Sequence, residues 1–283
     1  MSQSVAPFDC LLSRLQFRGQ LVAQTGLRIG VGRDTDVTGN DLPVMRDANG
    51  RPFIPGASFK GVLRSSLEAL LRGLGATSDQ QRRLACMVLS SSERCISDRE
   101  LDKLRQEYPD PKQAHLLSEA IIQHTCLICQ TFGSTTLASH VAIRDLPVEP
   151  SLWFGQFEVR QGVSLDRDTE TAREGQLYSF ETVPPGTRFN LEIEAHNLRE
   201  WQNGLLWLGL QPFLRGEMRL GGARSRGLGH VTLLECEWRS WAGEPGHPEK
   251  VIELLRNGPS IISIDPTPWQ QALRSKLDEV LHA

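Results

Sequence analysis

The sequence predicts an α+β fold in which β-α-β units share an antiparallel sheet. Strictly alternating apolar residues at 188–195 indicate a half-buried strand, and apolar residues at helical spacing from Ala57 to Gly73 indicate an amphipathic helix. The order along the chain is strand, helix, insertion, strands, protrusion, strand, helix, glycine loop and strand. This order predicts a ferredoxin-like core.

The first part of this core is expected at residues 1–75. Residues 8–30 contain alternating β-formers that lead into a glycine-rich turn, and residues 31–55 carry the Asp, Asn, Gly and Pro typical of a loop. The helix that follows is preceded by Pro55-Gly56 and closed by Gly73, which are residues typical of helix ends.

An insertion and a protrusion interrupt the core. Residues 76–130 are polar and helical in patches, which indicates an inserted region. Residues 162–180 are polar and charged between strand-like segments, so they predict a protruding hairpin or loop at about 160–185.

The second part of the core is expected at residues 131–245. It includes a buried helix at 201–214, a Gly/Arg loop, and a strand at 231–238. Residues 246–283 are expected to form a tail of one or two short helices.

Composition restricts the class of protein. With 283 residues, 39% hydrophobic and 23% charged, the chain has an ordinary globular composition, which excludes wholesale disorder. The net charge of -3 excludes a uniformly basic coat for nucleic acid but allows local basic patches. The chain lacks a long apolar run and a signal-peptide pattern, so we expect a cytosolic protein without a membrane partner.

The cysteines indicate a metal site. In the cytosol the six cysteines are expected to be reduced thiols or metal ligands. Four of them lie in the insertion: Cys86, Cys95, Cys126 and Cys129. The last two form a C-x2-C knuckle, typical of structural Zn²⁺, whereas the first two are more loosely spaced and leave His124 as a substitute ligand. Buried thiols without metal are the alternative, and Cys10 and Cys236 are expected in the core.

The start of the predicted helix offers a phosphate site. Free N–H groups and a partial positive charge at a helix N-terminus attract anions. Ser58 is expected to cap this helix, and Lys60 and Arg64 add cations in its first turns. A capped amphipathic helix with solvated charges is the alternative interpretation.

A second candidate site is the loop from Gly221 to His230. Gly221 and Gly222 let backbone approach a ligand closely, and Arg224 and Arg226 suit phosphate groups. The loop precedes a strand, whereas a dinucleotide-binding fingerprint follows a strand and opens a helix. A turn with exposed arginines is the alternative.

Acidic residues precede the predicted helix. These are Asp34, Asp36, Asp41 and Asp47. Carboxylates beside phosphate-binding cations can hold Mg²⁺ or move a proton. Asp is also a common turn residue, so a purely structural role is the alternative.

Three stretches occur together in a recognisable order. The first runs from Gly39 to Arg64 and includes Asn40-Asp41-Leu-Pro-Val and Pro55-Gly-Ala-Ser-Phe-Lys; the others are 165–189 and 221–229. In this order they resemble the RAMP superfamily, and most of all the repeated backbone subunit of type III CRISPR effector complexes. The cysteine-bearing insertion is similar to those of the type III-D and fused single-chain effectors, which favours that branch.

The resemblance implies a structure and a function. It implies an RRM-like palm with a zinc-knuckle insertion and a protruding β-thumb, in subunits that stack along a guide RNA beside other subunits of the complex. It implies cleavage of complementary single-stranded target RNA by Asp41 with Mg²⁺ or another divalent ion. The residues expected to contact RNA are Arg46, Ser58, Lys60, Arg64, Arg167, Gly221, Gly222, Arg224 and Arg226.

Two other functions are compatible with the same motifs. One is a structural RNA-binding subunit in which Asp41 is only a turn residue. The other is an endoribonuclease that processes the precursor of the guide.

Overall fold

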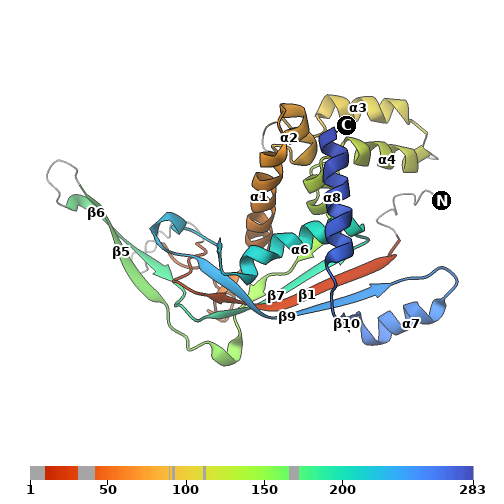
Figure 1. The fold of residues 1–283 in the computed structure, drawn as a ribbon. Helices are drawn as coiled ribbons and strands as arrows, with labels where there is room; N and C mark the ends of the chain where they lie inside the picture. The colour runs from red at the N-terminus through yellow and green to blue at the C-terminus, as the bar shows by residue number, and fades with distance from the viewer. Residues whose placement is uncertain are drawn as a thin grey trace.

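An antiparallel sheet forms the centre of the molecule. The computed structural model describes residues 10–30, 42–88, 90, 93–110, 113–165 and 172–282; of residues 164, 165 and 172–177 only the backbone is described. The strands lie in the order β10-β9-β1-β7-β3, with β8 paired to β9 (Figure 1). They are β1 (Ser13–Ala23), β3 (Val141–Ile143), β7 (Arg188–His196), β8 (Met218–Arg219), β9 (His230–Ala242) and β10 (Ser260–Ile262).

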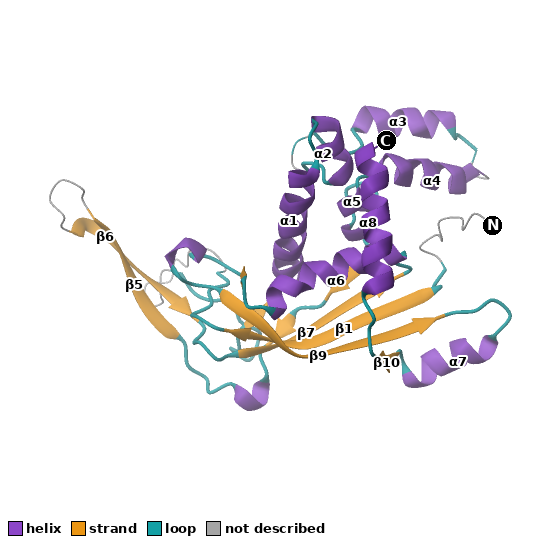
Figure 2. Cartoon of the chain, viewed as in Figure 1, coloured by secondary structure: helices purple, strands orange, loops and turns teal. Residues whose placement is uncertain are grey.

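Three helices cover one side of this sheet (Figure 2). They are α1 (Gly56–Leu74), α6 (Glu200–Leu214) and α8 (Thr267–His282). The connection β1-α1-β3-β7-α6-β9 has the β-α-β-β-α-β pattern of ferredoxin-like folds. The α+β prediction with an antiparallel sheet is therefore confirmed.

Helix α1 forms because its apolar residues recur once per turn. The buried side chains are Phe59, Leu63, Leu67 and Leu71. At this i, i+4 spacing they make one stripe, which packs against α6. The rings of Phe59 and Phe213 are 4.7 Å apart between centroids. The predicted helix at 57–73 is confirmed with nearly the same limits.

Helix α6 is buried between α1 and α8, and two glycines allow the close packing. A Cβ at Gly209 would lie 2.8 Å from Leu63 Cδ1, and one at Gly204 would lie 2.4 Å from the Trp269 carbonyl oxygen. Any side chain at these positions would push the helices apart. The predicted buried helix at 201–214 is therefore confirmed.

The inserted region is helical. It contains α2 (Ser78–Leu84), α3 (Asp98–Glu107), α4 (Ala114–His124) and α5 (Leu127–Phe132). Thr77 and Ser97 begin α2 and α3 with capping boxes. The side-chain amide of Gln80 donates to the Leu281 carbonyl at 2.7 Å, so the insertion is held against the end of α8.

The C-terminal segment is more ordered than the sequence indicated. It contains α7 (Pro248–Asn257), strand β10 and the 16-residue α8. The sequence predicted only short helices here, because a three-residue edge strand makes too short a pattern to detect. None of the described helices is long and apolar enough to cross a membrane.

A hairpin projects from one end of the sheet (Figure 1). It consists of β5 (Glu158–Leu165) and β6 (Ala172–Thr182), which pair antiparallel over most of their length. A second short pair is formed by β2 (Phe53–Ile54), just before α1, and β4 (Leu146–Pro147). Strand β4 is followed by a short 3₁₀ turn, η2 (Pro150–Leu152).

Candidate functional site

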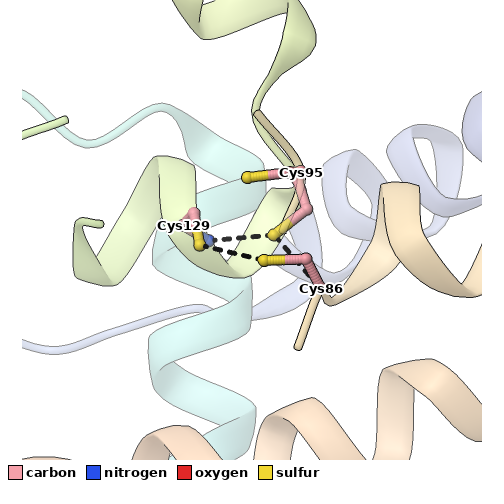
Figure 3. A group of neighbouring side chains, drawn as sticks. Cys86, Cys95 and Cys129 are labelled. Carbon is pink, nitrogen blue, oxygen red and sulfur yellow. Dashed lines mark hydrogen bonds between the residues drawn. The ribbon is translucent and has the colours of Figure 1, made fainter. Parts of the chain in front are cut away.

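Four cysteine side chains from separate parts of the insertion meet in one cluster (Figure 3). The sulfur atoms of Cys86, Cys95, Cys126 and Cys129 all lie within 4.8 Å of one another. The backbone N–H groups of Cys86 and Cys129 both donate to Cys126 Sγ, each at 3.4 Å. Cys126 immediately precedes α5, so the C-x2-C knuckle bends around the start of a short helix.

The spacing of the sulfurs fits a tetrahedral metal site. Cys86 Sγ and Cys129 Sγ are 3.7 Å apart. Zn–S bonds of about 2.3 Å place the sulfurs of a regular tetrahedron about 3.8 Å apart. His124 is exposed, and its Nδ1 lies 2.8 Å from the carbonyl oxygen of Ala120 in its own helix. The cluster thus contains both Cys86 and Cys95, and not His124.

The four thiols influence one another strongly. Hydrogen bonds with Cys126, Cys129 and Cys86 lower the pKa of the Cys95 thiol. Hydrogen bonds with the other three thiols, together with burial, raise the pKa of Cys126. Four thiolates this close would repel one another, and a cation between them would remove that penalty.

The remaining cysteines lie apart from the cluster. Cys10 and Cys236 are exposed, so the expectation that they lie in the core is wrong. Glu235 has a positive φ of 53°, and the β1–β9 register shifts between Arg18 and Gln20. This irregularity in the ladder accompanies exposed side chains at 234–236.

The glycine loop packs closely on the segment that follows β1. Gly221 has φ +78°, and a Cβ there would lie 2.2 Å from the Arg28 carbonyl oxygen. The same oxygen accepts the N–H of Gly222 at 2.8 Å. Only glycine combines this conformation with this approach. Gly221 therefore does bring backbone close to a partner, and in this structure that partner is the chain itself.

The arginines of this loop point to the surface. Arg224 and Arg226 are exposed and form a 3₁₀ turn, η3 (Arg224–Arg226). Arg226 Nη1 donates to the Tyr178 hydroxyl on β6 at 2.8 Å. Arg224 lines an open pocket of about 370 Å³ beside Ser65 and Ser66 of α1. The loop therefore presents two cations between the projecting hairpin and the first helix.

The start of α1 differs from its prediction. Pro55 occupies the N-cap, so Ser58 lies in the first helical turn and does not cap the helix. The Gly56 N–H donates instead to the Asp145 carboxylate at 2.8 Å. A carboxylate from a distant segment thus already occupies part of the predicted anion site, and only the tertiary fold brings it there.

The cations of α1 are engaged within the molecule. Lys60 Nζ donates to Ser139 Oγ and to the Val141 carbonyl, at 2.7 and 2.8 Å. Burial, with the nearby charge of Arg64, lowers the pKa of Lys60. Arg64 donates to Glu68 at 2.7 Å, to the Gly133 carbonyl at 2.9 Å and to Cys129 Sγ at 3.3 Å. Arg64 therefore links α1 to the cysteine cluster.

Two of the acidic and basic candidates lie in the loop before α1. Asp47 accepts the N–H groups of Asn49 and Arg51, each at 2.9 Å, so it serves as a turn residue. Arg46 pairs with Glu181 at 2.5 Å. The catalytic candidate Asp41, the earlier Asp34 and Asp36, and Arg167 all lie outside the described residues.

The open face of the sheet carries cross-strand ion pairs. Arg18 and Arg144 both contact Glu192, at 3.4 and 3.2 Å, and Arg188 contacts Glu235 at 2.8 Å. The paired carboxylates neutralise the charge of these arginines. The open face of the sheet therefore attracts an anion less strongly than the arginines of the glycine loop do.

Three residues of this region were not predicted from the sequence. Asp145, Tyr178 and Glu181 contact the start of α1, Arg226 and Arg46, respectively. Each partner lies at least 48 residues away in the chain. No spacing pattern could have indicated such contacts, because they depend on how the elements pack.

Comparison with known proteins identifies relatives over most of the chain. The sequence model of the RAMP superfamily matches residues 20–232. The CRISPR system Cms endoribonuclease Csm3 of Methanocaldococcus jannaschii is 26% identical over 241 residues, which is 80% of this chain and 81% of that protein. The protein of the same name from Methanothermobacter thermautotrophicus is 26% identical over 265 residues, 81% of this chain and 89% of the relative. That from Enterococcus italicus is 44% identical over 59 residues, 20% of this chain and 28% of the relative.

Proposed function

The chain belongs to the RAMP superfamily, and on this premise we propose that it is a backbone subunit of a type III CRISPR ribonucleoprotein that binds guide RNA and cleaves target RNA. The observation that carries the proposal is its match, over four fifths of its length, to two proteins named Csm3 endoribonuclease. The expected partners are a guide RNA, a complementary target RNA and neighbouring subunits of the complex.

We assign the guide to the surface around the glycine loop. Arg224 and Arg226 are exposed there, whereas the arginines on the open face of the sheet are paired with carboxylates. Phosphate contacts carry no sequence information, so base pairing within the RNA can supply the specificity. A local cationic surface of this kind is compatible with the overall charge of -3.

The other proposed RNA contacts need a change of partner or lie elsewhere. Lys60 and Arg64 would have to exchange internal hydrogen bonds for phosphate contacts. Arg46 would have to share its guanidinium with Glu181. Ser58 lies in the first turn of α1, and Arg167 lies in the sequence between the two strands of the hairpin that we propose as the thumb.

We propose that the hairpin β5–β6 crosses the guide–target duplex and that cleavage takes place beside it. In the proposed step the 2′-oxygen of the target bonds to the adjacent phosphorus, and the bond from that phosphorus to the 5′-oxygen breaks. The 2′-hydroxyl proton passes to a base, and the departing 5′-oxygen takes up a proton.

Asp41 is the residue that we assign to this reaction. Its carboxylate either accepts the 2′-hydroxyl proton or holds Mg²⁺ or another divalent ion through the hard oxygen donors that such ions prefer. A bound divalent ion would stabilise the negative charge that develops on the phosphate. The residue follows Gly39-Asn40 and precedes Leu42, where the described chain resumes.

We further propose that the cysteine cluster holds a structural Zn²⁺. Four sulfurs within 4.8 Å of one another leave no ligand position for a reacting molecule. The ion would connect the segment of Cys86 and Cys95, which precedes α3, to the knuckle at the start of α5. The hydrogen bond from Arg64 to Cys129 Sγ would extend this connection to α1.

The test of the catalytic assignment is Asp41→Ala in the assembled complex. We expect target cleavage to disappear at the sites this subunit serves, while binding of guide and target persists. Asp47→Ala is the matched control, because it removes a carboxylate from the same loop whose partners are the nearby Asn49 and Arg51 N–H groups and the Arg51 guanidinium. Unchanged cleavage by Asp41→Ala at every site would reject the catalytic role and favour a structural RNA-binding subunit.

A further inference from the structure

A buried carboxylate lies at the root of the projecting hairpin. Glu181, on β6, is only 8% exposed. Its Oε2 accepts the Val44 N–H at 3.2 Å and the Arg46 guanidinium at 2.5 Å. One acidic side chain of the hairpin thus binds two residues of the loop that precedes α1.

The guanidinium of Arg46 is held on a second side. Its Cζ lies 3.9 Å from the centroid of the Phe157 ring, just before β5. A planar guanidinium both stacked on a ring and paired with a carboxylate has few other orientations open to it. Both sides of the hairpin root therefore contribute to fixing one loop side chain.

Backbone bonds continue the same attachment toward the preceding residue. The Glu181 N–H donates to the Leu42 carbonyl at 3.1 Å, and Leu42 forms a parallel bridge with Phe180. On the opposite side the Met45 N–H donates to the Ile29 carbonyl at 2.8 Å. Residues 42–46 thus lie between the hairpin root and the segment that follows β1.

We propose that Glu181 is a positioning residue for RNA cleavage, which fixes residues 42–46 to the hairpin and so sets where the chain delivers Asp41. This inference rests on the proposed function. Asp41 is covalently joined to Leu42, whose carbonyl is bonded to β6. The hairpin that would cross the guide–target duplex is thereby joined to the loop that would carry the carboxylate.

Fastening of this kind matters because in-line attack tolerates little misplacement. An error of about 1 Å in the position of a reacting group can cost about a hundredfold in rate. A carboxylate carried by a loop reaches its geometry only when that loop is held by rigid elements. Glu181 supplies that attachment from β6, at the root of the hairpin that we propose as the thumb.

The experiment uses Glu181→Gln in the assembled complex. This change keeps the size of the side chain and the charge of Arg46, so any phosphate contact of Arg46 is preserved. We expect hydrogen exchange over residues 42–46 to quicken by about tenfold or more, because the buried acceptor no longer carries a charge. We expect the single-turnover cleavage rate to fall by about tenfold to a hundredfold, with little change in affinity for guide or target.

Glu158→Gln is the matched control. Glu158 pairs with Arg160 and accepts a weak hydrogen bond from the Thr182 hydroxyl on the same hairpin, but 41% of its side chain is accessible and it does not contact residues 42–46 in the described interactions. Exchange and cleavage should both stay as in the unmodified complex. If Glu181→Gln fails to assemble, Glu181→Asp, which keeps the charge on a shorter side chain, carries the same two measurements.

Three results would overturn the inference. They are unchanged exchange in Glu181→Gln, faster exchange without a slower cleavage step, and a rate decrease fully accounted for by weaker target binding. Asp41→Ala separates this from the proposed function, since it should abolish cleavage while exchange over 42–46 stays slow. Full cleavage by Asp41→Ala would reject the catalytic assignment, and the exchange result for Glu181→Gln would still show whether that residue holds the loop.

Discussion

The first helix and the glycine loop carry similar residues but use them differently. Arg64 on α1 has only 20% of its side chain exposed. It donates hydrogen bonds to Glu68 on its own helix, to the Gly133 carbonyl oxygen and to Cys129 Sγ in the cysteine cluster. Arg224 and Arg226 in the loop are exposed. A cation on a helix that packs against the core lies close to internal acceptors and is hydrogen-bonded to them. A cation on an exposed loop has fewer such acceptors and remains accessible to an anion from solvent. The same residue type is therefore held by internal hydrogen bonds in one region and exposed to solvent in the other.

The largest effect is expected from the cysteine cluster that Arg64 contacts. If the cluster holds Zn²⁺ as we propose, Cys126→Ser should lower the zinc content and destabilise the inserted helices by about 5 kcal/mol or more, because structural Zn²⁺ contributes on the order of 10 kcal/mol in small domains. Elemental analysis and thermal unfolding measure both effects. Cys10→Ser is the control, since Cys10 is exposed and outside the cluster. Equal metal content in the two variants would contradict the zinc assignment.

A glycine pair tests how firmly the loop is anchored. Gly221→Ala forces a Cβ to within 2.2 Å of the Arg28 carbonyl oxygen at positive φ and should cost about 3 kcal/mol. Gly227 also has positive φ, but no described atom lies within 4 Å of a Cβ placed there. Gly227→Ala should therefore cost only about 1 kcal/mol. Denaturant unfolding compares the two, and equal costs would show that the loop can move away from Arg28.

Removal of an arginine should destabilise the protein more when the arginine lies on α1 than when it lies in the glycine loop. Arg64→Ala should lower the free energy of unfolding by about 2 kcal/mol, because it leaves the Gly133 carbonyl and Glu68 without a charged partner from this side chain. Arg224→Ala should change it by less than about 0.5 kcal/mol, as is usual for an exposed residue. Urea unfolding of the two variants measures this, and the comparison fails if both are destabilised equally.

The smallest effect is expected on the free energy of RNA binding when the two loop arginines are removed. Arg224→Ala and Arg226→Ala together should weaken binding of single-stranded RNA and lower the slope of log affinity against log salt by about 0.7 for each phosphate that is no longer neutralised. Titrations at several salt concentrations measure the slope. Arg256→Ala, an exposed arginine on α7, should leave it unchanged. A slope that is the same in all these proteins would remove the glycine loop from the RNA interface.

Local patterns predicted most of the elements and part of the site. The helix at 57–73, the buried helix at 201–214 and the strand at 188–195 follow from apolar periodicity, which acts within one element. The C-x2-C knuckle and the glycine pair at 221–222 could also be found in the sequence, because each motif consists of residues that are close together in the chain.

Interactions between distant segments were not predictable in this way. The sequence left open whether Cys86, Cys95 or His124 completes the cysteine cluster, and the prediction that Ser58 caps α1 was wrong. Packing decides both points, because Cys86 and Cys95 converge on the knuckle and Asp145 reaches the first N–H of the helix.

The sequence by itself determined the kinds of residue available and the elements that carry them, because helix, strand and knuckle form from interactions a few residues apart. Only the tertiary structure decided which charges remain exposed and which are paired within the molecule. Lys60, Arg64 and Arg46 donate to hydroxyl, carbonyl or carboxylate groups of the same molecule, whereas Arg224 and Arg226 are exposed and Arg226 contacts only the neutral Tyr178 hydroxyl among the interactions of the described residues. The physical reason is that burial penalises an unpaired charge, so a cation near the core is retained where the fold provides an acceptor.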